Sequence, residues 1–217
     1  PDVEVRVEQS SLWAGLRSVV PALGAKRVGI DRSRTTLADS DELRKLAGVD
    51  WVPIPNPVEK LRAAKDAGEI ASIRDAGRLA EEALQAVIPF ITAGRTELDI
   101  AAELEAALRR RGSEWHPFPP IVASGPRTAL PHARATARPV GRGELLLIDF
   151  GAQLEGYCSD ITRTYVVGGP PDSRQREVYT VVHQAQLRAI GGLRAGLTGR
   201  EADGLARDAI ARAGMGE

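Results

Sequence analysis

The sequence predicts an α+β protein with two parts, a small α/β segment at residues 1–56 and a larger domain at residues 57–217. In the first part, short runs typical of strands alternate with stretches of helical character. In the second part, apolar residues recur at helical spacing on both sides of a run that is typical of paired strands. Segregation of helices from antiparallel strands is characteristic of the α+β class.

Residues 1–56 contain predicted strands and helices in alternation. The elements, in order, are a strand at 3–7, a helix at 10–20, a strand at 26–31, a helix at 40–47 and a strand at 49–54. The segment Pro53–Pro57 then has a proline at every second position. Because each proline disfavours helix in the residue before it, this segment is expected to be an extended linker. The sequence therefore predicts a domain boundary near residue 57.

The larger domain is predicted to begin with one long helix at residues 58–89, where apolar residues recur at helical spacing. A second helix is expected at Thr96–Arg111, because Thr96 and Asp99 resemble a capping box and Gly112 is a typical helix stop. After a loop rich in proline and glycine, the predicted elements are paired strands within 144–167 and helices at 173–194 and 198–213.

The last two predicted helices resemble the first two. When Ala93 is aligned with Ala195, 102 residues later, three more pairs match: Gly94 with Gly196, Thr96 with Thr198, and Gly112 with Gly214. Thr198 and Glu201 again form a capping-box pattern. If these matches reflect an internal duplication, a second strand pair is expected at roughly 246–269, beyond residue 217. The alternative is chance similarity between alanine-rich helices.

The composition excludes several classes of protein. The 29 basic and 29 acidic side chains give a net charge of zero, which argues against a general binder of nucleic acid or of a membrane surface. No apolar run approaches the ~20 residues that span a bilayer, and no signal peptide is recognisable. The single cysteine, Cys158, fits a reducing compartment. A cytoplasmic enzyme, with both chain ends resembling cuts, is the simplest interpretation.

Asp149 and Asp160 are the first candidate functional residues. Asp149 follows the apolar run Leu145–Ile148, so its carboxylate is expected to be partly buried. If the hairpin turn is centred between Leu154 and Glu155, Asp149 lies directly opposite Asp160, with Cβ atoms about 5 Å apart. Because opposed like charges destabilise a strand pair, one or two divalent cations between them would explain the arrangement. The alternative is that both are structural residues, hydrogen-bonded or protonated.

Thr162 and Cys158 lie on either side of Asp160, on the second strand of the predicted hairpin. Thr162 lies on the same predicted face as Asp160, where it could orient a carboxylate or a water molecule on the metal. Cys158 would point to the opposite face, and no chemistry is assigned to it. The tripeptide Asp149–Gly151 matches the magnesium-binding motif of protein kinases, but no glycine-rich phosphate loop and no His-Arg-Asp motif precede it.

Three motifs occur together: Pro131-His132, Ile148-Asp-Phe-Gly-Ala152 and Gly156-Tyr-Cys-Ser-Asp160-Ile-Thr-Arg-Thr164. With Ile121–Gly125 before the histidine, and with the helix around 61–74, they make residues 57–217 resemble the pita-bread metallopeptidases. That group includes Xaa-Pro aminopeptidase, prolidase, creatinase and methionine aminopeptidase. The resemblance implies an α+β pita-bread fold, incomplete in this chain, with residues 1–56 as the end of an N-terminal α/β domain.

The resemblance also implies roles for particular residues. Asp149 and Asp160 would be the first two of five metal ligands, with Asp160 bridging two divalent ions; manganese is favoured, with cobalt and zinc as alternatives. His132 would face the substrate and stabilise the tetrahedral intermediate. Without the resemblance, its position after a proline indicates an ordinary loop histidine. His116 and His183 have no matching context. The other ligands, one histidine and two glutamates, are expected beyond residue 217, so residues 1–217 alone are expected to bind metal weakly and to show no turnover.

The implied activity is hydrolysis of peptide bonds that precede proline, by an aminopeptidase or a dipeptidase. The implied partners are peptides with proline in the second position and a second copy of the chain, in a homodimer. A creatinase-like amidinohydrolase and a non-catalytic peptide-binding module of the same fold are the alternatives. Methionine aminopeptidase fits less well because of the N-terminal segment and the Pro131-His132 context.

Overall fold

The structure is a computed structural model that describes residues 7–46, 48–56 and 58–216. The chain divides into two compact units, residues 1–66 and 67–217. The first compact unit includes the short helix α3 (Glu59–Arg62), and the domain boundary near residue 57 stays a prediction. An ion pair of 3.4 Å between Arg34 and Glu59 joins α3 to the rest of this unit.

The first unit contains two helices and two parallel strands. Its elements are α1 (Leu12–Ala22), β1 (Arg27–Asp31), α2 (Leu37–Arg44) and β2 (Asp50–Ile54), with β1 paired to β2. Four of the five predicted elements are therefore present. Helix α2 begins three residues earlier than expected because Thr36 and Asp39 form a capping box. The strand predicted at residues 3–7 lies outside the described residues, except for Val7, which is not in a strand.

The second unit begins with helix α4 (Ala67–Val87), which continues into the short 3₁₀ helix η1 (Ile88–Phe90). The prediction of one unbroken helix from residue 58 was wrong, because the chain leaves the helix after α3. Asp66 directly precedes α4, and aspartate is favoured immediately before a helix. None of the helices in the described part of the chain is long and apolar enough to span a membrane.

Helix α5 (Glu97–Arg110) begins with the predicted capping box. The backbone N–H of Asp99 donates to Thr96 Oγ1 at 3.0 Å, and the N–H of Thr96 donates to Asp99 Oδ2 at 3.0 Å. Two backbone donors that have no partner within the helix are satisfied in this way. The helix start is therefore encoded by local sequence alone.

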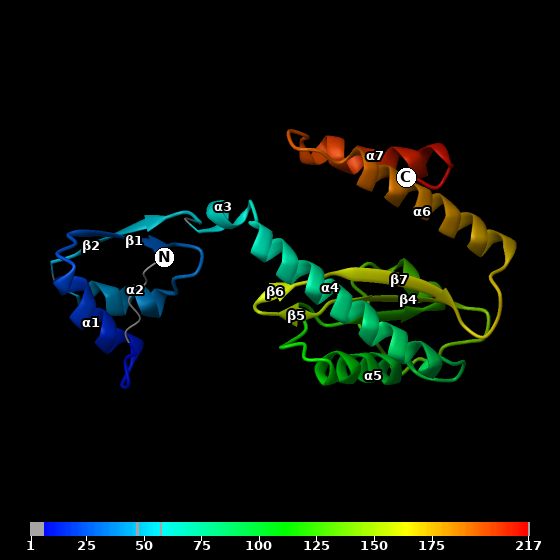
Figure 1. Ribbon diagram of the computed structural model, residues 1–217, viewed down its shortest axis with the longest axis horizontal. Helices are drawn as coiled ribbons and strands as arrows, with labels where there is room; N and C mark the ends of the chain where they lie inside the picture. Colours follow the sequence, from blue (N-terminus) through cyan, green and yellow to red (C-terminus); the bar gives the residue numbers. More distant parts are fainter. Residues whose placement is uncertain (1–6, 47, 57, 217) are drawn as a thin grey trace. The chain divides into compact units, whose positions relative to one another are not determined.

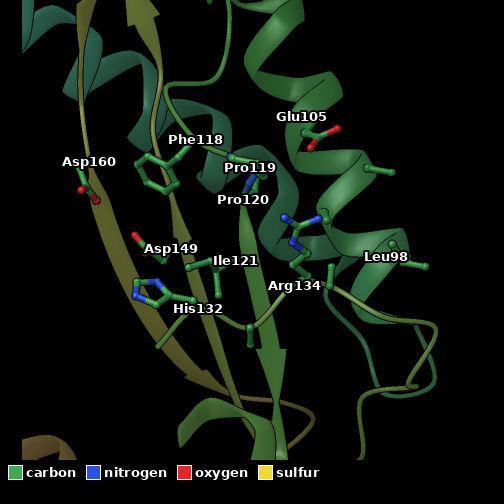
Figure 2. A pocket seen from close by; sticks show the side chains of 14 residues that line it. Leu98, Glu105, Phe118, Pro119, Pro120, Ile121, His132, Arg134, Asp149 and Asp160 are labelled. Carbon is green, nitrogen blue, oxygen red and sulfur yellow. The ribbon is translucent and has the colours of Figure 1, made fainter. Parts of the chain in front are cut away.

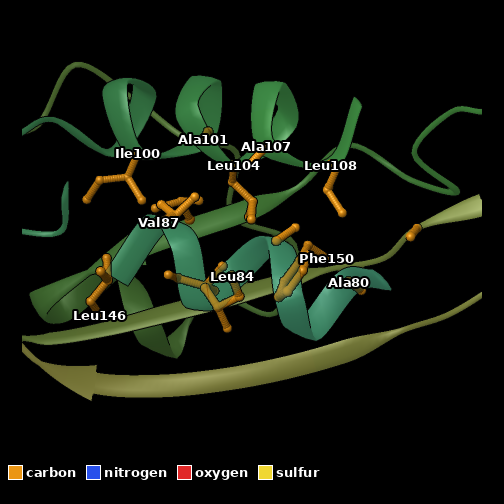
Figure 3. Packing of buried hydrophobic residues seen from close by; sticks show 14 of the residues in the cluster. Ala80, Leu84, Val87, Ile100, Ala101, Leu104, Ala107, Leu108, Leu146 and Phe150 are labelled. Carbon is orange, nitrogen blue, oxygen red and sulfur yellow. The ribbon is translucent and has the colours of Figure 1, made fainter. Parts of the chain in front are cut away.

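The centre of the second unit is an antiparallel sheet in the order β3 (Ile121–Ser124), β4 (Leu145–Phe150), β7 (Ile161–Val166). Strand β3 was not predicted, since its four residues follow a proline-rich loop. In β4, alternate side chains are fully buried, and they form the core with α4 and α5 (Figures 1 and 3). The residues of β4 in this core are Leu146, Ile148 and Phe150. The intervening residues, Asp149 among them, consequently lie on the opposite face of the sheet.

A short hairpin connects β4 to β7 and corrects the predicted register. It consists of β5 (Gln153–Leu154) and β6 (Tyr157–Cys158), so its turn residues are Glu155 and Gly156. Both have positive φ, 51° and 77°, which is typical of a type I′ turn. Leucine disfavours positive φ whereas glycine accepts it, and the turn therefore lies one position later than expected.

Helices α6 (Ser173–Gly192) and α7 (Gly199–Arg212) pack against each other. The predicted capping box of Thr198 and Glu201 is present. Their connections repeat the backbone conformation of α4 and α5, because Gly94 and Gly196 have φ of 93° and 91°, and Gly112 and Gly214 have φ of 97° and 71°. These matched positions agree with an internal duplication over a 102-residue offset, as between Gly94 and Gly196.

Candidate metal centre

Of the two predicted metal ligands, Asp149 lies in β4 and Asp160 directly precedes β7. In the observed register, Asp149 of β4 pairs with Thr162 of β7, so the prediction that Asp149 lies directly opposite Asp160 was wrong. Asp160 precedes Thr162 by two positions and lies just before the start of β7. The register therefore differs from the predicted one by two positions, and Figure 2 shows the two carboxylates near each other.

The backbone on either side of the aspartates is held in close contact. The N–H of Ser159 donates to the carbonyl of Ala152 at 2.9 Å, and the N–H of Ala152 donates to Ser159 Oγ at 3.0 Å. A Cβ atom on Gly151 would lie 1.9 Å from the carbonyl oxygen of Ser159. Only glycine fits at this position, two residues after Asp149, and the crossing it permits places Asp160 beside β4.

Thr162 contacts the aspartate that it faces across the strands. Its hydroxyl Oγ1 donates a hydrogen bond to Asp149 Oδ1 at 3.0 Å. This bond restricts the orientation of the Asp149 carboxylate. The role expected for Thr162, orientation of a carboxylate or of a water molecule on the metal, stays a prediction.

The electrostatics of the pair indicate that its charge is not compensated. Burial raises the pKa of Asp149 above its ordinary value; the hydrogen bond from Thr162 lowers it, but the negative charge of Asp160 raises it further. A partly buried carboxylate beside a second one is costly unless a cation or a proton is shared between them. The pair is therefore suited to a divalent cation.

His132 lies in a loop that follows strand β3 and the 3₁₀ helix η2 (Gly125–Ala129). Its side chain is exposed and lies beside Asp149 in Figure 2. His116 stacks on Trp115 with ring centroids 4.6 Å apart, and His183 lies 6.0 Å from the ring of Tyr179. Neither of these two histidines lines the cavity that His132 lines.

A cavity of about 630 Å³ contains the three predicted residues His132, Asp149 and Asp160. Its other lining residues come from helix α5, from the segment before and into β3, and from the loop around the histidine: Leu98, Ala101, Ala102, Glu105, Phe118, Pro119, Pro120, Ile121, Ala133, Arg134 and Ala135. Arg134 and the apolar wall at Phe118–Ile121 were not predicted from the sequence as parts of the site. The proline-rich composition of residues 117–120 was the only available signal for that wall.

The donors present suit a hard divalent ion, since both are carboxylates. Within the described ranges, no group of three or more His, Cys, Asp or Glu side chains could hold a metal ion. As metal ligands, Asp149 and Asp160 would supply only part of a coordination shell, because a stable site needs further donors.

Comparison with known proteins identifies the family. Residues 71–217 match the model of metallopeptidase family M24. The Xaa-Pro dipeptidase of Pyrococcus horikoshii is 38% identical over 195 residues, which cover 89% of this chain and 55% of that protein.

Two solved structures, an Xaa-Pro dipeptidase from Bacillus anthracis and an X-Pro aminopeptidase from Thermotoga maritima, have TM-scores of 0.88 and 0.89 and identities of 38% and 37%. Each match covers 96% of this chain and 59% of the other, so the chain spans less than two thirds of the length of these relatives. The predicted α+β pita-bread fold, incomplete in this chain, is confirmed. The chain belongs to metallopeptidase family M24.

Proposed function

We propose that the protein to which this chain belongs hydrolyses peptide bonds that precede proline, as a dipeptidase or an aminopeptidase. The observation that carries the proposal is the grouping of His132, Asp149 and Asp160 around one cavity, in a chain of a metallopeptidase family. Relatives named for Xaa-Pro dipeptidase and X-Pro aminopeptidase activity support the substrate class.

In this proposal Asp149 and Asp160 would hold two divalent ions. When bound, such ions activate a water molecule and polarise the scissile carbonyl. Carboxylate ligands favour manganese, with cobalt and zinc as alternatives. Thr162 restricts the rotamer of Asp149 through its 3.0 Å hydrogen bond, which preorganises that ligand before an ion arrives.

His132 acts on the substrate rather than on the metal. From its position beside Asp149, the imidazole can donate a hydrogen bond to the carbonyl oxygen on which negative charge develops during attack. The hydrogen bond strengthens as that charge grows, which lowers the barrier.

The cavity wall suits a prolyl residue. Phe118, Pro119, Pro120 and Ile121 present apolar surface next to the aspartates. A peptide bond before proline is a tertiary amide without an N–H, so the wall at this point needs no hydrogen-bond acceptor. The pyrrolidine ring can therefore be buried against apolar atoms without leaving a polar group unsatisfied.

The test compares matched substrates. With manganese present, the protein that carries this chain is expected to hydrolyse an Xaa-Pro dipeptide at least tenfold faster than the corresponding Xaa-Ala dipeptide, on the order of the discrimination a shaped pocket provides. Equal rates on the two substrates, or no hydrolysis of either, would contradict the proposal. Residues 1–217 alone are expected to bind manganese weakly and to show no turnover, which calorimetry and the same assay measure.

The proposal includes an assembly and a location. We propose a cytoplasmic location, which fits the single cysteine, Cys158, and a homodimer, which rests on the family resemblance alone. Sedimentation of the intact protein tests the dimer, and a mass of one chain at micromolar concentration would contradict it.

A further inference from the structure

Glu97, at the start of helix α5, is a buried charge to which the proposed mechanism gives no role. Its side chain is 0% exposed, and no other charged residue in the described part of the chain is buried. Burial opposes its ionisation, but hydrogen bonds from Thr136 and Ser124 outweigh this effect and hold its pKa below the ordinary value. Because a buried charge is costly unless it is paired and hydrogen-bonded, the partners of Glu97 indicate what it does.

The partners of Glu97 lie on both sides of His132 in the sequence. Before the histidine, Ser124 donates to Glu97 Oε1 through its N–H at 2.9 Å and its hydroxyl at 2.8 Å. After the histidine, Thr136 donates to Glu97 Oε2 through its N–H at 3.1 Å and its hydroxyl at 2.7 Å. One carboxylate therefore joins the two ends of the loop at residues 125–135, which carries His132.

Arg127 links the same carboxylate to the interior of this loop. Its Nε donates to the two oxygens of Glu97 at 3.2 and 3.1 Å, and its Nη2 donates to the carbonyl oxygen of Arg134 at 2.6 Å. The backbone carbonyl of Arg127 accepts a hydrogen bond from the N–H of Leu130 at 3.0 Å. Arg127 thus contacts the loop before His132, at Leu130, and after it, at Arg134.

His132 itself lies in a tight turn. The N–H of Ala133 donates to the carbonyl of Leu130 at 3.2 Å, which places Pro131 and His132 in the two central positions. Proline is favoured in the first of these positions because its φ is already fixed. The turn sets the local backbone of His132, but the place of the whole turn depends on its flanks, which Arg127 holds.

We propose that Glu97 and Arg127 are positioning residues, which hold the turn of His132 so that its imidazole lies beside Asp149 (Figure 2). This inference rests on the proposed function, because it takes His132 as the group that faces the substrate. Neither Glu97 nor Arg127 lines the cavity, so each acts through the loop rather than by contact with a ligand. Supporting contacts of this kind keep a functional side chain within the narrow range of positions that catalysis needs.

The first test measures hydrogen exchange in the metal-free intact protein by mass spectrometry. Glu97→Gln and, separately, Arg127→Gln are expected to raise the exchange rates of the amides of Leu130 and Ala133 about tenfold, because the turn opens more often. The control Leu104→Ala leaves a cavity in the core on the same helix and should raise exchange in α5 more than in the turn. Unchanged exchange of the turn in both variants, or the same change in the control, would overturn the inference.

The second test is a double-mutant cycle in the metal-loaded intact protein with an Xaa-Pro dipeptide. Glu97→Gln is expected to lower kcat about tenfold and to change KM less than about twofold, since the substrate still binds but its carbonyl loses the imidazole. In a His132→Ala background, the same substitution should lower kcat less than about twofold, because no imidazole remains to be positioned. Equal losses of kcat in the two backgrounds would refute a role through His132.

The two tests separate this inference from the proposed function. Selective loosening of the turn, together with no hydrolysis of Xaa-Pro dipeptides, would sustain the positioning of His132 and refute the proposed function. Hydrolysis of these dipeptides, together with unchanged exchange of the turn in Glu97→Gln and Arg127→Gln, would refute the inference and sustain the proposed function.

Discussion

Two acidic clusters of the second unit differ in how their charge is balanced. Glu97 and Glu144 each face an arginine, at 3.1 and 2.6 Å, and their pKa values lie below the ordinary value. Asp149 faces Asp160 and a threonine instead, and its pKa is raised, first by burial and then, against the hydrogen bond from Thr162, by the charge of Asp160. The first cluster is complete without a ligand, whereas the second gains stability only when a cation is added.

The comparison separates residues that hold the fold from residues that await a ligand. In the first cluster, removal of an acid leaves an arginine or several buried donors without a partner. In the second, removal of an acid relieves a repulsion. Substitution of an acid is therefore expected to lower the free energy of unfolding in the first cluster and to leave it unchanged or raise it in the second.

Asp160→Asn is expected to abolish metal-dependent hydrolysis by the intact protein, by about a thousandfold or more, because a bridging ligand of both ions is lost. The same substitution should leave metal-free residues 1–217 as stable as before or more stable by up to about 1 kcal/mol, since it removes one of two like charges. Assays and urea unfolding measure the two effects. The control Asp208→Asn, on α7, should change neither, and retained turnover in Asp160→Asn would contradict the bridging role.

Glu97→Gln is expected to destabilise residues 1–217 by about 3 kcal/mol, because Arg127 and the donors of Ser124 and Thr136 lose a buried charge. Urea unfolding monitored by circular dichroism measures the change. Glu103 provides a matched control on the same helix, where its 38% exposed carboxylate pairs with Arg110. Glu103→Gln should cost less than about 0.5 kcal/mol. Equal costs would mean that the buried network has no special role.

The Arg138–Glu144 pair makes a prediction about acid stability. The hydrogen bond from Arg138 lowers the pKa of Glu144 from 4.5 to about 2 in the folded chain. A depressed carboxyl pKa contributes stability above the unfolded value, and this contribution is lost as the pH falls from about 4.5 to about 2.

Glu144→Gln should therefore be less stable than wild type by about 2 kcal/mol at pH 7, a value reduced from the full shift because the pair is partly exposed. The difference should shrink through this pH window, as urea unfolding at several pH values measures. If the difference in unfolding free energy between the two proteins stays constant down to pH 2, Arg138 does not lower the pKa of Glu144.

Sequence patterns predicted most helices of this chain because their signals are local. Thr96 with Asp99 and Thr198 with Glu201 lie three residues apart, and each pair forms its capping box in the structure. The fold family and the candidate residues Asp149, Asp160 and His132 also followed from motifs of contiguous residues. The family is confirmed, whereas the roles of these residues stay predictions.

Features that depend on distant residues were missed or misplaced. The register between Asp149 and Asp160 was wrong by two positions because it depended on which turn residues accept positive φ. Strand β3 (Ile121–Ser124) was missed since it is short and recognisable only beside β4. The Glu97 network was missed because its partners Ser124 and Thr136 lie 27 and 39 residues away along the chain.

By itself, the sequence determined where helices α5 and α7 start, because the capping boxes that begin them act over a few residues. Only the tertiary structure decided which charges are paired. Arg127 and Arg138 look like Arg134 in the sequence, and the first two are distinguished from it by the carboxylates that the fold brings within 3.1 and 2.6 Å. Electrostatic pairing depends on distance in space, which the order of residues along the chain does not specify.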